Sequence, residues 1–108
     1  MGYNIIMRKI LFEVETPLNI KIRITEEYWR YIIEIKHPVM TGKEEIVKKI
    51  LKEPDEIRKS KIDENVLLFY KKFDKLYCVV VKCYEREGFI ITCYPTEKIK
   101  EGEKIWKK

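Results

Sequence analysis

The sequence is most unusual in the residue types it lacks. Its 108 residues include no alanine and no glutamine and a single serine, whereas isoleucine, lysine and glutamate are abundant. Few thermolabile residues and a surface rich in Lys and Glu are typical of proteins from heat-adapted organisms. A very AT-rich genome gives a similar bias. The composition therefore indicates a thermophile without excluding the second origin.

Paired cysteine motifs are missing as well. The three cysteines, Cys78, Cys83 and Cys93, are odd in number, and none of their spacings is C-x-x-C. This pattern argues against a zinc site. We expect the three to be buried as small hydrophobic residues in a reducing cytoplasm. The sequence thus predicts neither a metal nor any other cofactor.

Long apolar segments and nucleotide-binding loops are also absent. The apolar runs are far shorter than the roughly 20 residues that cross a bilayer, and no signal peptide is recognisable, so we expect a cytoplasmic protein without a membrane contact. The sequence contains no Gly-rich phosphate loop, no HExxH motif and no Ser-His-Asp order. Most enzyme classes are therefore unsupported.

Length and charge define what is present. We expect residues 1–7 to be a flexible leader and residues 8–108 to form one domain. A hydrophobic content of 45% and a charged content of 38% fit a compact domain. The net charge is +5, which permits binding to a polyanion such as nucleic acid. Most charges alternate in sign along the chain, however, as on an ordinary solvated surface.

The first half of the chain predicts a hairpin and a helix. Residues 8–14 and 18–24 alternate apolar and polar side chains and are joined by a turn, so they form two strands. Thr25 is a good helix N-cap. The helix that follows ends at His37, because Pro38 disfavours helical geometry in the residue before it.

A second helix and three strands complete the predicted fold. The helix begins at the apparent capping box Thr41–Glu44 and ends at Pro54; its buried stripe is Ile46, Val47, Ile50 and Leu51. A short strand is expected around Ile57. The strands 66–73, 76–84 and 88–94 have short connections and form an antiparallel meander. Strand 76–84 is central because it is nearly continuously apolar. The tail is amphipathic at most, and its Trp106 docks against the domain. The prediction is an α+β domain with an N-terminal hairpin and two helices followed by an antiparallel sheet.

Polar side chains gather where the last predicted strand ends at a proline. Strict alternation would put Thr92 and Tyr94 on one face together with Ile90, and Phe89, Ile91 and Cys93 on the other. His37, the only histidine, also stands directly before a proline. The functional hypothesis requires these two places to meet in space.

The residue types at these two places suit metal-independent cleavage of RNA. That reaction needs a proton taken from the 2′-hydroxyl, a proton given to the leaving 5′-oxygen, and cations beside the phosphate. Histidine performs either proton transfer near neutral pH, and Lys or Arg stabilises the charge. The ordinary alternatives are a helix-terminal histidine that stabilises the helix dipole and a Thr-x-Tyr pair that reflects strand propensity alone.

The segments KHP, EPDEI, VLLFYKKF, LYCVVVK and GFIITCYPT together resemble the phage-associated barnase/EndoU/colicin/RelE-like (BECR) nuclease superfamily, most of all its small uncharacterised members. The resemblance covers about residues 10–105. It implies an RNase/RelE-like α+β fold and a metal-free ribonuclease activity. It also implies a possible role as the toxin of a toxin–antitoxin or mobile-element locus, with RNA as substrate and an acidic antitoxin protein as partner.

Carried over by position, the family's helical histidine falls on His37, its strand threonine on Thr92 and the following tyrosine on Tyr94. The family's basic residue falls on no single position. Arg58, Lys71 and Lys82 all remain candidates, although Lys71 and Lys82 are equally explained as solubilising charges on the sheet. The candidates for substrate binding are Lys36, Tyr70 and Lys82, and Tyr70 either lines the site or fills the core.

One departure from the family bears on the mechanism. Some relatives carry a second histidine about one and a half helical turns before the first, where this chain has Tyr31 and Ile32. The second proton-transfer group must then be a lysine, a tyrosine or the substrate itself. The competing hypothesis is a non-catalytic module of the same fold that binds RNA or protein.

Overall fold

The computed structural model describes residues 9–99 and 102–108, so the expected leader 1–7 and Arg8 lie outside the described residues. The described elements follow in the order β1 (Ile10–Glu15), β2 (Lys21–Thr25), α2 (Glu26–Tyr31), η1 (Ile32–Lys36), η2 (Pro38–Met40), α3 (Glu44–Lys52), β3 (Glu56–Lys59), β4 (Val66–Lys72), β5 (Leu76–Tyr84), β6 (Glu87–Thr96) and β7 (Glu103–Lys107). The predicted α+β class is confirmed.

The described strands form one 7-stranded sheet in the order β1-β2-β6-β5-β4-β3-β7. The predicted N-terminal hairpin is β1–β2 and the predicted meander is β4–β5–β6, and β5 stands in the middle as expected. The prediction of a purely antiparallel sheet is wrong, because β2 pairs with β6 in parallel. Such a pair requires a long crossover, and here both helices and three strands lie between the partners.

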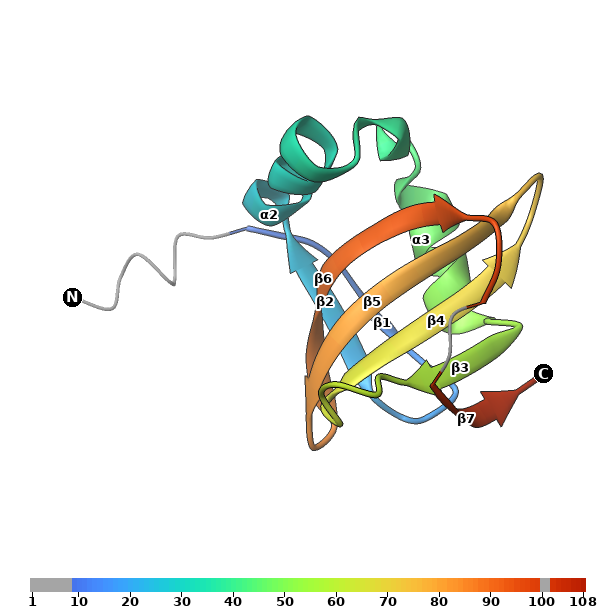
Figure 1. Cartoon of the computed structure of the whole chain (residues 1–108). Coiled ribbons are helices and arrows are strands. Elements are labelled where there is room, and N and C mark those ends of the chain that lie inside the picture. Colours follow the sequence, from blue (N-terminus) through green and yellow to red (C-terminus); the bar gives the residue numbers. More distant parts are fainter. Residues whose placement is uncertain (1–8, 100–101) are drawn as a thin grey trace.

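The core lies between the sheet and helix α3, which contacts β1, β4 and β5. The sheet curls so that β1 and β2 pass behind β5 in Figure 1, and α3 lies on the inner side of the curl. Ile22, Ile50, Leu51, Phe69 and Val79 are fully buried there. Complete burial of one such side chain contributes about 1.5–3 kcal/mol.

Helix α2 begins as predicted and ends differently. The Thr25 hydroxyl accepts a hydrogen bond from the amide of Tyr28 at 3.1 Å, which confirms the N-cap. The regular helix stops at Tyr31, and η1 continues it as a π-helical turn that closes when the His37 amide donates to the Ile32 carbonyl at 2.7 Å. The wider turn keeps Ile32 in the core while it carries Lys36 and His37 toward β6.

The predicted capping box of α3 is wrong. The N-cap of α3 is Lys43, which makes no side-chain cap bond. The hydroxyl of Thr41 instead donates to the carbonyl of Pro38 at 2.7 Å, within the short 3-10 turn η2. Gly42 then reverses the chain with a φ of 79°. The buried stripe is otherwise confirmed, with Val47, Ile50 and Leu51 inside and Ile46 partly buried against the core.

The last segment extends the sheet. The expected short strand around Ile57 is β3, and β7 pairs with its outer edge. Trp106 lies opposite Ile57 and packs against the core, so its predicted docking is confirmed. The sequence predicts an amphipathic tail at most, so the strand β7 is absent from the prediction.

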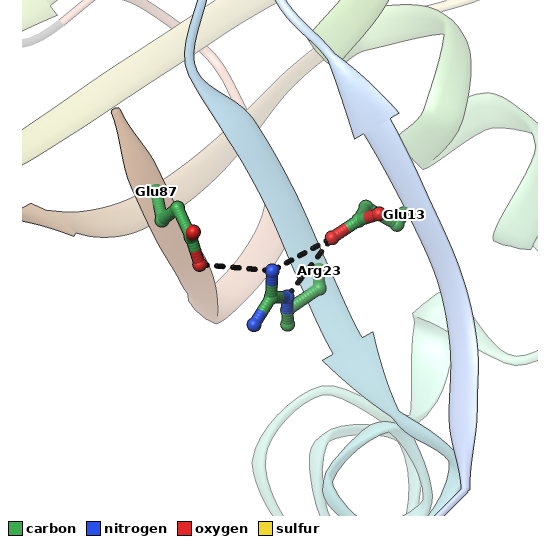
Figure 2. A network of polar contacts seen from close by, with 3 residues as sticks. All are labelled: Glu13, Arg23 and Glu87. Carbon is green, nitrogen blue, oxygen red and sulfur yellow. Dashed lines mark hydrogen bonds and ion pairs between the residues drawn. The ribbon is translucent and has the colours of Figure 1, made fainter.

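An ion-pair network joins three strands on the sheet surface (Figure 2). Arg23 on β2 contacts Glu13 on β1 at 2.8 Å and Glu87 on β6 at 2.9 Å. The network thus spans the one parallel pair of the described sheet. All three side chains are at least 40% exposed, so each pair contributes at most about 1 kcal/mol.

Candidate functional site

A β-bulge in β6 determines which side chains reach the surface. Val80 pairs with Thr92 while Val81 pairs with Ile90, which leaves Ile91 without a cross-strand partner. The strict alternation expected from the sequence is therefore wrong before the bulge. Ile90 lies on the core side with Cys93, and Phe89 shares the opposite side with Thr92.

The side of the sheet opposite α3 is called the outer face below. Cross-strand partners share a face, so the outer face is given by three rows of paired residues, which are Glu56–Tyr70–Cys78–Tyr94, Arg58–Leu68–Val80–Thr92 and Val66–Lys82–Phe89. Thr92 and Tyr94 lie in neighbouring rows, as the sequence predicted. Residues i and i+2 of a strand, such as Thr92 and Tyr94, are about 6.6 Å apart.

The carbonyl that the bulge frees fixes the first helix over β6. Ile91 O accepts a hydrogen bond from the phenol of Tyr28 at 2.8 Å and another from the amine of Lys36 at 3.3 Å. Lys36, a predicted substrate-binding residue, is therefore engaged at this carbonyl. Its amine also lies 5.7 Å from the centre of the Tyr31 ring.

The two places singled out in the sequence meet at the end of β6. The rings of His37 and Tyr94 lie 5.3 Å apart between centroids, with 44° between their planes. Burial, and to a smaller extent the charge of Lys36, lowers the pKa of His37. Burial, with smaller contributions from Cys78 and Tyr70, raises the pKa of Tyr94. Both rings are therefore neutral at pH 7.

A cleft of about 650 Å³ opens on the outer face beside these rings. This β6 cleft has strand residues as its floor and loop residues as its walls. Its lining is Val66, Leu68, Val80, Thr92 and Tyr94 from the strands, Ser60, Lys61 and Ile62 from the loop after β3, and Lys98 and Ile99 from the segment after β6. The floor is mainly apolar, and the charged residues of the lining, among residues 9–99 and 102–108, are the two lysines.

Tyr70 lies on the same face of the sheet as Tyr94, with Cys78 between them. It lies in the same row of the outer face as Cys78 and Tyr94, and it is only 1% exposed. Tyr70 is not among the residues that line the β6 cleft. Tyr70 is buried on the outer side of the sheet, against the site, and does not belong to the core between the sheet and α3.

Two of the predicted cations share the outer face but are paired with carboxylates. Arg58 forms an ion pair with Glu56 and donates to the carbonyl of Gly102 at 3.0 Å. Lys82 contacts Asp63 at 2.6 Å. Arg58 occupies the same row as Thr92, three strands away, which corresponds to roughly 14 Å.

The third predicted cation lies on the other side of the sheet. Lys71 is the cross-strand partner of Tyr77, a core residue, and its amine contacts Asp55 at 3.4 Å. The structure therefore does not bring Lys71 together with Thr92 and Tyr94.

Sequence reasoning missed the cleft and its lysines. Lys61 and Lys98 stand in polar loops whose paths depend on how β3, β6 and β7 are placed, and no local pattern encodes that. Within residues 9–99 and 102–108, no group of three or more His, Cys, Asp or Glu is arranged to hold a metal ion. No helix in that part of the chain has the length and apolar character needed to span a bilayer.

Comparison of the chain with protein-family models, with curated protein sequences and with solved structures finds no match. The functional argument therefore depends on the residues of this site alone.

Proposed function

We propose that the protein is a small metal-independent endoribonuclease whose catalytic centre is the end of β6. The observation that carries the proposal is the contact between His37 and Tyr94, whose ring centroids are 5.3 Å apart beside Thr92 and the β6 cleft. A neutral imidazole and a protonated phenol at one point are the proton acceptor and proton donor that the reaction needs.

The proton balance closes with these two rings. The His37 imidazole takes the proton of the 2′-hydroxyl, and the 2′-oxygen attacks the adjacent phosphorus. The bond from phosphorus to the 5′-oxygen breaks, and the Tyr94 phenol protonates that oxygen. The products are a 2′,3′-cyclic phosphate and a 5′-hydroxyl end. The imidazolium then returns its proton to the phenolate, which restores both groups.

The raised pKa of Tyr94 determines the rate of RNA cleavage that we expect. General acids act best when their pKa lies near the working pH, and burial keeps that of Tyr94 well above its usual value. We therefore expect slow turnover. Among the described residues, the cations that line the cleft are Lys61 and Lys98.

A partner follows from the same proposal. An unregulated cytoplasmic ribonuclease is harmful to its cell, so such an enzyme would be held by an inhibitor. Because the chain carries a net charge of +5, we expect an acidic antitoxin protein that covers the outer face and competes with RNA.

The test is cleavage of a mixed RNA in EDTA, with the product ends identified by mass spectrometry. We expect cyclic phosphate ends from the wild type, and a rate about 10²–10⁴-fold lower for His37→Ala. Lys52→Ala, an exposed substitution at the end of α3 and outside the cleft, serves as the matched control. Equal rates for all three proteins would identify a contaminating nuclease and refute the proposal.

A second candidate is a non-catalytic RNA- or protein-binding module. It is favoured by the ion pairs Arg58–Glu56, Lys71–Asp55 and Lys82–Asp63, because each candidate for the cation that stabilises the phosphorane charge is paired with a carboxylate. Binding of RNA without cleavage by the wild type would select this candidate.

A further inference from the structure

Four lysine amines in the described part of the chain lie over aromatic rings, and one of them differs from the other three. Lys48, Lys71 and Lys82 each also form an ion pair with a carboxylate, at 2.9, 3.4 and 2.6 Å. The amine of Lys36 lies 5.7 Å from the centre of the Tyr31 ring, and no carboxylate of the described residues pairs with it. Of the four charges, this one is therefore open to an anion from outside the protein.

The amine of Lys36 is held at the end of β6 beside the proposed general base. It donates to the Ile91 carbonyl at 3.3 Å, and an ammonium group has two further protons to donate. The side chain is partly buried, so water compensates its charge incompletely. Burial and then the charge of Lys36 lower the pKa of His37, so the ammonium lies close to the imidazole. An anion bound to this amine would thus lie beside His37.

The ring of Tyr31 offers a second kind of contact at the same place. It is 44% exposed, and it lies 5.6 Å from the ring of Tyr28, whose phenol binds the same Ile91 carbonyl as Lys36. Single-stranded nucleic acids bind where bases stack on aromatic rings and cations contact the phosphates. An acidic peptide would use the cation but has no base to stack on the ring. The two features together favour RNA over such a peptide.

We infer that Lys36 and Tyr31 form a nucleotide subsite beside His37, in which the ammonium binds the scissile phosphate of single-stranded RNA and the Tyr31 ring stacks on an adjacent base. This assignment depends on the proposed function and deepens it. Lys36 becomes the cation that stabilises the phosphorane charge, a role left open by the three predicted cations that are paired with carboxylates. Every base has a flat face, so the subsite adds affinity without selecting a base.

The first test measures the contribution of the ring. Binding is followed by fluorescence anisotropy at fixed salt, with 2′-fluoro octanucleotides of each of the four bases, which cannot be cleaved. We expect Tyr31→Ala to bind each of them about 5- to 100-fold more weakly than the wild type, and Tyr31→Phe, which keeps a ring, to bind like the wild type. Tyr84→Ala is the matched control and should bind with unchanged affinity. Tyr84 is 58% exposed and has a lysine amine 5.9 Å from its ring, but that lysine, Lys82, is ion-paired.

The second test measures the contribution of the charge. Lys36→Gln keeps a hydrogen-bond donor and removes the charge, so we expect cleavage to be about 10²–10³-fold slower. We also expect the slope of log affinity against log salt to be smaller by roughly 0.7. Tyr28→Phe is the matched control, because it removes the other donor to the Ile91 carbonyl without a change of charge, and it should leave the salt slope unchanged. Circular dichroism checks the fold of each variant.

The outcomes distinguish the subsite from the nuclease. RNA that is bound and cleaved equally well by the wild type, Tyr31→Ala and Lys36→Gln would overturn the subsite and leave the nuclease standing. A wild type that neither binds nor cleaves any RNA would overturn both. Binding of polyglutamate in place of RNA by the wild type would also overturn both, and it would assign this surface to an acidic protein.

Discussion

The imidazole of His37 packs against the phenol of Tyr94 with 5.3 Å between ring centroids, although one ring belongs to the end of a π-helical turn and the other to a strand. The contact is held from two sides. The chain direction is fixed by Pro38, and the helix is tied to the bulge carbonyl of Ile91 through Tyr28 and Lys36. The proton donor and acceptor of the proposed reaction are therefore placed by backbone features.

The pH dependence of activity follows from the lowered pKa of His37. A general base works in its neutral form, and burial keeps this imidazole neutral to a lower pH than the usual 6.5. We expect the cleavage rate of the wild type to rise with pH below 6.5 and to be level at neutral pH. A midpoint above 6.5, measured from rate profiles or from an NMR titration of the imidazole, would contradict the described burial.

The lowered pKa of His37 also determines how the stability of the fold changes with pH. The unfolded chain binds a proton to His37 at a higher pH than the folded protein does, so the unfolded state carries more protons between the two pKa values. Stability is then fully present above 6.5 and falls as the pH drops through the folded pKa. We expect urea denaturation to show this loss, and His37→Asn to remove it.

The bond from Tyr28 to the bulge should be measurable. Tyr28→Phe removes one of the two donors to the Ile91 carbonyl while it keeps the ring, so we expect a loss of about 0.5–1.5 kcal/mol in unfolding free energy. Tyr31→Phe is the matched control, because Tyr31 is 44% exposed on the same helix. Equal effects of both substitutions would show that the bond to the bulge contributes nothing.

Several features of this site were predictable and others were not. Two short patterns, each with a proline that ends an element, marked His37 and Tyr94 as places of interest, but they did not predict that the two rings meet. The bulge at Ile91 was not predictable, because Ile90 and Ile91 are equally apolar and either can face the core. A one-residue change of register reverses every side chain before it, so Phe89 and Ile90 were assigned to the wrong faces.

The sheet, too, has features that could be predicted from the sequence and features that could not. Strand β5 was predicted to the residue, because a continuous apolar run between turns has one interpretation. The parallel pairing of β2 with β6 was missed, since parallel and antiparallel partners impose the same alternation on Lys21–Thr25. Gly88 marks only the close approach of β6 to β5, a pair that the predicted meander already contains. A side chain there would approach the carbonyl of Lys82 to 2.7 Å, which marks a place where backbones come close.

Gly88 and Gly42 should therefore respond differently to substitution. Gly88→Ala places a methyl group 2.7 Å from a carbonyl oxygen and 3.0 Å from Ile22, so we expect a loss of about 1–3 kcal/mol. Gly42 has open space but a φ of 79°. Gly42→Asn should be nearly neutral, because Asn tolerates that conformation, whereas Gly88→Asn should be at least as harmful as Gly88→Ala. Thermal unfolding of the three variants and the wild type checks this order.

Salt dependence tests the ligand of the outer face. Each phosphate that a lysine neutralises on a single strand adds roughly 0.7 to the slope of log affinity against log salt. We expect RNA binding by the wild type to weaken steeply with salt, and Lys98→Ala to reduce the slope by about one such contact. Lys52→Ala, a substitution at the exposed end of α3, should leave it unchanged. A salt-insensitive interaction would contradict phosphate binding and leave the cleft as a contact for an uncharged partner.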